Sequence, residues 1–238
     1  MGGRGASETG RTGRALRIPN SALATDSFPE FILGWTLGQL VFECSNNMKA
    51  EDVEIWKSVL EVQKKMRPYA PFFNWPDKQI KELGVVDCLL QAIREQEGRN
   101  WIKETEPGPD VNLPPDVIGI THENTRVAFE VTELIDQSNI DKSIKRQTLK
   151  FQDWQPDEII NRLELILADK GLIDFGKGSF ASVVLVIHTD ELQISLDQCR
   201  RAIAIHQFVQ REQIDEAYLI FRPVPMGETC PYFRLSFK

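Results

Sequence analysis

The middle of the chain shows a pattern of apolar and polar positions that predicts two short strands joined by a turn. Residues 115–120 and 126–134 are rich in branched and aromatic side chains, and the polar residues 122–125 separate them. Because successive side chains of a strand point to opposite faces, Glu130 and Thr132 are expected to share one face of the second strand. The pattern therefore places a carboxylate inside an otherwise apolar strand.

Two interpretations of this carboxylate stay open. A buried carboxylate costs free energy unless it is paired, protonated or bound to a cation. Asp116, at the start of the first strand, offers a second set of oxygens for one hard cation. In the structural alternative, Glu130 pairs with a base such as Arg126, and Pro115-Asp116 begins the strand only because that dipeptide suits a turn.

The rest of the chain predicts a succession of helices and strands that is typical of an α/β protein. Apolar positions at helical spacing predict helices over residues 76–97, 156–170 and 191–209. Short runs of branched and aromatic residues predict further strands over residues 100–105, 181–188, 216–221 and 231–236. We therefore expect a mixed β-sheet flanked by helices.

The N-terminal part differs in composition from the rest. Residues 1–25 are rich in Gly, Arg, Ser and Thr without periodicity, which predicts a disordered tail. Two helices, predicted over residues 28–44 and 50–66, form an N-terminal pair that would either cover the sheet or support a homodimer. The expected organisation is the tail, a helical extension over residues 26–70 and an α/β domain over residues 71–238.

Charge and cysteine content narrow the classes of function. The chain has 238 residues and a formal net charge of -7, which disfavours a protein that coats nucleic acid through a broad basic surface. An enzyme that contacts a few phosphates stays compatible, since residues 137–152 form a locally basic stretch containing Lys142, Lys145, Arg146 and Lys150. The four cysteines match no zinc spacing, and no apolar run has transmembrane or secretory character. These features predict a cytoplasmic protein with reduced thiols.

The helix predicted over residues 76–97 carries a further carboxylate of interest. Glu82 lies at helical spacing from Val86, Leu89 and Ile93, so it is expected to point toward the buried side of the helix. The ordinary alternative is a boundary residue that pairs with a nearby base.

With its parts in this order, the chain resembles the PD-(D/E)xK nuclease superfamily, which has the restriction-endonuclease-like fold. In that pattern a helix with a glutamate precedes a three-stranded meander. Glu82 matches the glutamate of that helix. Pro115-Asp116 matches the Pro-Asp of the middle strand, and Glu130-Val131-Thr132 matches (D/E)-x-K. The similarity covers roughly residues 78–190. A closer likeness is to uncharacterised bacterial proteins with a Glu-Val-Thr-Glu-Leu strand, followed by a tryptophan and a helix that ends in lysine, here Trp154 and Lys170.

The resemblance implies a nuclease that uses Mg²⁺, or Mn²⁺, to hydrolyse phosphodiester bonds in DNA, or with a lesser expectation in RNA. The cation would be held by Asp116, Glu130, the Val131 carbonyl and Glu82, and it would activate the attacking water.

The resemblance also implies a lysine that orients the water or stabilises charge on the phosphate. Thr132 stands at its usual position and brings no positive charge. The lysines near enough in sequence to replace it are Lys142, Lys145, Lys150 and Lys170. A lysine at the end of a helix, such as Lys170, is also favoured there by the helix dipole, and Lys150 or Arg146 of the basic stretch is a comparable candidate. The alternative function is a nuclease-like domain without catalysis that serves as a binding or assembly module.

Overall fold

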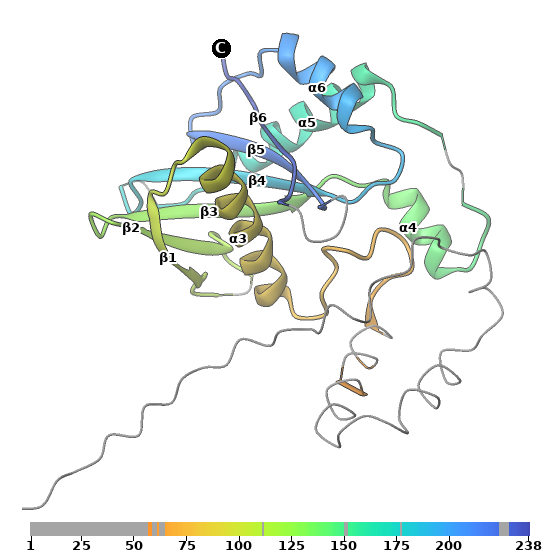
Figure 1. Cartoon of the computed structure of the whole chain (residues 1–238), viewed down its shortest axis with the longest axis horizontal. Coiled ribbons are helices and arrows are strands. Elements are labelled where there is room, and N and C mark those ends of the chain that lie inside the picture. The colour runs from red at the N-terminus through yellow and green to blue at the C-terminus, as the bar shows by residue number, and fades with distance from the viewer. Residues whose placement is uncertain are drawn as a thin grey trace, which may run out of the picture. The chain divides into compact units, whose positions relative to one another are not determined.

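Six strands form one mixed sheet in the order β1-β2-β3-β4-β5-β6, as Figure 1 shows for the computed structural model. The central pairs β3–β4 and β4–β5 are parallel, and the other pairs are antiparallel. The strands are β1 (Ile102–Pro107), β2 (Val117–Thr121), β3 (Arg126–Glu133), β4 (Ser182–Thr189), β5 (Glu216–Phe221) and β6 (Tyr232–Arg234). The helices are α3 (Lys78–Glu97), α4 (Gln137–Ile144), α5 (Pro156–Lys170) and α6 (Leu196–Ile205). The predicted mixed α/β architecture is confirmed.

The structure describes residues 57, 58, 61, 65–110, 112–149, 152–176, 178–223 and 229–238. All of them belong to one compact unit, Trp56–Lys238. The predicted tail and nearly all of the predicted N-terminal helical pair lie outside the described residues. No helix in the described part of the chain is both long and apolar enough to cross a bilayer.

Helix α3 covers one face of the sheet, and α5 and α6 cover the other (Figure 1). On one face, α3 packs against alternate residues of β3, β4 and β5, and its core positions include Val86, Leu89 and Ile93. On the other face, α5 and α6 pack against β4 and β5, with Leu163 and Leu167 of α5 fully buried. The parallel strands are covered on both sides, which explains why β4 is apolar along most of its length.

Local sequence signals set the ends of two helices. The Asp77 side chain accepts a hydrogen bond of 3.0 Å from the Ile80 N–H at the start of α3, and Gly98 adopts the left-handed conformation at its end. Pro156 occupies the first turn of α5, and Gly171 follows its last residue. These helices therefore begin and end close to the predicted residues.

The helix predicted over residues 191–209 is shorter than expected. α6 ends at Ile205, and the Phe208 N–H donates to the Ser236 carbonyl at 2.8 Å beside a parallel bridge between Phe208 and Phe237. Residues 206–209 are therefore not helical, because Phe208 pairs with the C-terminal segment instead. Helical periodicity in the sequence does not reveal this long-range pairing.

Candidate active site

Three carboxylates from separate elements line one cavity of about 430 Å³. Glu82 comes from α3, Asp116 precedes β2, and Glu130 lies in β3. The cavity also contains Lys78, Lys81, Val131, Thr132, Glu133 and Lys170. The structure thus brings together five of the six residues predicted as catalytic: Glu82, Asp116, Glu130, Thr132 and Lys170. The sixth, Lys150, lies outside the described residues.

Asp116 is held from both sides by the backbone of neighbouring strands. Its Oδ2 accepts a hydrogen bond of 2.9 Å from the Val131 N–H of β3. Its carbonyl accepts one of 2.8 Å from the N–H of Gly108, which follows β1. The predicted strand start is shifted slightly, since β2 begins at Val117. Asp116 therefore sits at the strand terminus with one carboxylate oxygen fixed.

Glu130 is buried on the sheet and pairs with the end of α5. Lys170 Nζ lies 2.8 Å from Glu130 Oε1, and the Glu130 side chain is 7% exposed. Burial raises the pKa of Glu130, although the Lys170 ammonium opposes that rise. The alternative in which Glu130 pairs with Arg126 or another base therefore agrees with the structure in its second form, since Lys170 from a distant helix supplies the cation.

The second oxygen of this carboxylate, Glu130 Oε2, is buried without a hydrogen-bond partner among the described residues. A buried acceptor left unpaired costs free energy, whereas a bound cation would satisfy it.

Glu82 faces the cavity from α3, as its helical spacing predicts, and is 4% exposed. Lys78 Nζ bridges the two acids, at 3.4 Å from Glu82 Oε1 and 3.3 Å from Asp116 Oδ1. Burial and the negative charge of Asp116 raise the pKa of Glu82 to about 7, in spite of Lys78. Lys78 was missed by the sequence reasoning, although its spacing of four residues from Glu82 signals a helical ion pair.

A second ionic cluster borders the cavity at the end of β3. Arg67 donates to both carboxylate oxygens of Glu133, one of these bonds measuring 2.9 Å, and lies 3.8 Å from Asp190 Oδ1. Burial raises the pKa of Glu133, but Arg67 outweighs this and the net pKa is lowered. Glu133 is thus held in an ion pair with Arg67, and no motif in the sequence indicated this partner.

Thr132 and Val131 also line the cavity. Thr132 is partly buried and brings no charge, so positive charge comes to the cavity from Lys78, Lys81 and Lys170. In the described part of the chain, no group of three or more His, Cys, Asp or Glu side chains is already arranged around a common metal position. The donor set still suits a hard divalent cation, because Asp116, Glu130 and Glu82 share the cavity and Glu130 Oε2 is unpaired.

Comparisons with protein-family models, with curated proteins and with solved structures found no match to this chain.

Proposed function

We propose that this protein is a metal-dependent nuclease of the PD-(D/E)xK type. The observation that carries the proposal is the Lys170–Glu130 ion pair inside the cavity that also contains Asp116 and Glu82. It offers an acid and a lysine side by side although Thr132 stands at the usual lysine position. A lysine that migrates to a neighbouring element serves the same chemistry, because the position of its ammonium group matters more than its place in the sequence.

The order of elements supports the same proposal. A helix with Glu82 precedes the antiparallel meander β1-β2-β3, and α4 and α5 then connect β3 to the parallel strand β4. This is the succession expected of the restriction-endonuclease-like fold, with Asp116 just before the second strand of the meander and Glu130 in the third.

Asp116, Glu130 and Glu82 are the proposed ligands of one divalent cation, Mg²⁺ or Mn²⁺. When bound, the cation would polarise the scissile phosphate and lower the pKa of the attacking water. The Val131 N–H fixes one oxygen of Asp116 and leaves the other facing Lys78. The carboxylates are therefore partly oriented before any cation arrives.

Lys170 is proposed to orient the attacking water or to stabilise charge on the phosphate. Its side chain is 23% exposed, so its ammonium group reaches the cavity while remaining paired with Glu130. Lys78 and Lys81 add positive charge at the cavity wall, where a phosphate backbone would approach. The proposed substrate is DNA, with RNA as the second choice for testing.

Cleavage of single- and double-stranded DNA and RNA, with Mg²⁺, with Mn²⁺ and with a chelator, tests the proposal. We expect cutting by the wild type with a divalent cation, and a loss of at least about a hundredfold in Glu130→Gln and in Lys170→Met. Glu123→Gln and Lys103→Met serve as matched controls, since both residues are exposed and lie outside the cavity. Equal cutting by Glu130→Gln and wild type would exclude the proposed site.

Calorimetric titration with Mn²⁺ separates an inactive domain from an unsuitable substrate. Binding that disappears in Asp116→Asn, without cleavage of any substrate, would favour the proposed cation site in a domain that binds nucleic acid without cutting it. Absence of both binding and cleavage would reject the proposed function.

A further inference from the structure

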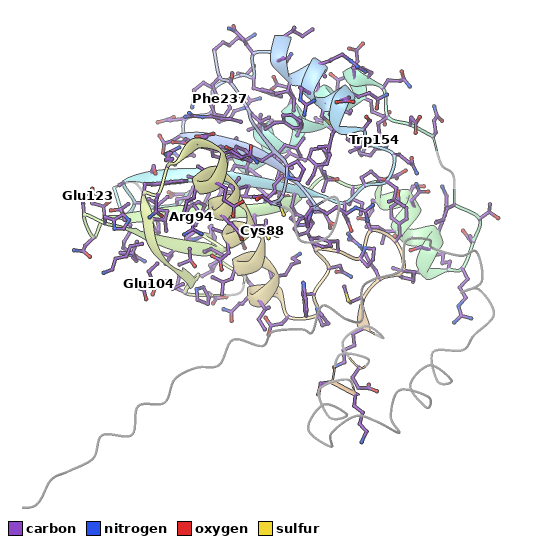
Figure 2. The ribbon with its side chains drawn as sticks, viewed as in Figure 1. Cys88, Arg94, Glu104, Glu123, Trp154 and Phe237 are labelled. Atoms are coloured by element: carbon purple, nitrogen blue, oxygen red, sulfur yellow. The ribbon has the colours of Figure 1, made fainter. Side chains whose placement is uncertain are left out.

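Two cysteines from separate elements share one hydrophobic cluster outside the cavity, and a side-chain hydrogen bond joins their thiols. Cys88 lies in α3 and is partly buried, as Figure 2 shows among the side chains of that helix. Cys230, 4% exposed, precedes β6 and belongs to the hydrophobic core against which Cys88 packs. Both are free thiols in the structure.

Hydrogen bonds on either side of Cys230 fix its segment against the same helix. The Thr229 hydroxyl donates to Glu95, and the Tyr232 hydroxyl donates to Glu97 at 2.6 Å. Both acceptors lie in the C-terminal half of α3. These two hydrogen bonds hold the segment that leads into β6, and with it Cys230, against α3, the helix that contains Cys88.

The two thiols differ in chemical character. A hydrogen bond from the Cys230 thiol lowers the pKa of the Cys88 thiol, although burial opposes this. The same hydrogen bond, together with burial, raises the pKa of Cys230. The thiolate is the reactive form of cysteine, so the lower pKa favours Cys88 as the attacking thiol and Cys230 as the resolving thiol.

We propose that Cys88 and Cys230 form a reversible disulfide when the protein meets a hydroperoxide. The Cys88 sulfur attacks one peroxide oxygen, the O–O bond breaks, and water leaves, so that Cys88 becomes a sulfenic acid. The Cys230 sulfur then attacks the Cys88 sulfur, the S–O bond breaks, and a second water leaves as the S–S bond forms. The two thiols together lose two protons and two electrons, which reduce hydrogen peroxide to two waters.

The disulfide would tie α3 to the β6 edge of the sheet by a covalent bond. No residue of the proposed cation site takes part, so the oxidation can be tested whatever reaction the cavity performs. A thiol reductant would restore the pair by exchange.

The test uses the full-length chain with Cys44→Ser, because Cys44 lies outside the described residues and could pair unpredictably. The reduced protein is treated with hydrogen peroxide, alkylated under denaturing conditions, digested and examined by mass spectrometry. We expect a cross-linked pair of peptides, containing Cys88 and Cys230, at the summed mass less two hydrogens, and its loss after dithiothreitol. Recovery of both cysteines as separate alkylated peptides would overturn the proposal.

Single variants test the order of the two steps. In Cys230→Ser, oxidation should stop at the sulfenic acid, so dimedone should label Cys88. In Cys88→Ser, Cys230 should escape both the cross-link and the label. Cys199 is the internal control, since it is fully buried and burial raises its pKa to about 12. Labelling of Cys199 as fast as of Cys88 would show unselective oxidation and reject the pair.

Discussion

The two oxygens of the Glu130 carboxylate have different surroundings. Lys170 pairs with one oxygen, whereas the other is buried without a hydrogen-bond partner among the described residues. Burial raises its pKa, so the charged form depends on the lysine. We expect Lys170→Met to lower the free energy of unfolding by about 2 kcal/mol near neutral pH, because a buried charge would lose its partner. Urea unfolding measures this.

Lys170→Arg is the matched control for that prediction, since it keeps a cation of similar length at the end of α5. It should retain most of the stability. Adding Glu130→Gln to Lys170→Met should restore most of the lost free energy of unfolding, because no unpaired charge is then buried. Equal stability of Lys170→Met and wild type would mean that the ion pair contributes little to folding.

The burial of His188 leads us to expect that the protein loses stability as the pH falls below neutral. The residue is 1% exposed, neither ring nitrogen has a hydrogen-bond partner among the described residues, and burial lowers its pKa to about 4. The unfolded chain, with a pKa of about 6.5 for histidine, binds the proton more readily. The stability that neutral His188 contributes is therefore fully present above about pH 6.5 and is lost as the pH falls through about 4.

The measurement compares unfolding of wild type and His188→Leu across that range. The wild type should lose up to about 3 kcal/mol more than the variant between about pH 7 and pH 4. His122→Asn is the control, because His122 is exposed in the turn before β3. Parallel pH profiles for wild type and His188→Leu would contradict the prediction.

At the scale of the elements, Gly108 makes room for the segment that presents Asp116. A Cβ at position 108 would lie 1.9 Å from the Pro115 carbonyl oxygen, which is backbone and cannot move aside independently. Gly108→Ala should therefore shift the start of β2 and lower the free energy of unfolding by about 2 kcal/mol or more. Affinity for Mn²⁺ should fall as well, since Asp116 moves with that backbone.

Gly84→Ala is the matched control, because nothing lies within 4 Å of a Cβ there and the residue is inside α3. It should raise stability by about 0.5–1 kcal/mol through helix propensity. Thermal unfolding of both variants, with Mn²⁺ titration of each, separates steric crowding at position 108 from the general effect of replacing glycine by alanine. Similar behaviour of the two alanine variants would show that the crowding at Gly108 is relieved without consequence.

Local patterns predicted the elements better than they predicted the contacts between them. α5 has the predicted ends because Pro156 and Gly171 act within the helix itself. α6 ends early because Phe208 pairs with a segment far along the chain. Helical spacing indicated the buried side for Glu82, whereas Asp116, Glu130 and Lys170 were grouped together only through the resemblance. The Lys170–Glu130 pair itself depends on the crossover through α5, which no local signal encodes. Lys78 is the exception, as its spacing from Glu82 was visible.

At the scale of the whole molecule, the net charge of -7 limits how the protein can hold a polyanion. Positive charge is available at the cavity, from Lys78, Lys81 and Lys170, and near α4, from Lys142 and Lys145. Two of these, Lys78 and Lys170, pair with acids, so we expect about three phosphate contacts in a complex with duplex DNA. The logarithm of affinity should then fall with the logarithm of salt concentration at a slope of about -2.7, or roughly fortyfold from about 50 to 200 mM salt.

Fluorescence anisotropy with the Glu130→Gln variant measures this slope without cleavage of the labelled duplex. Adding Lys142→Gln and Lys145→Gln together should reduce its magnitude by about 2 if both lysines contact phosphates. A slope steeper than about -6 would require a broad basic surface, which the composition disfavours. A slope near zero would mean that phosphates are not contacted, and binding to DNA would then lack the electrostatic term that the proposed function needs.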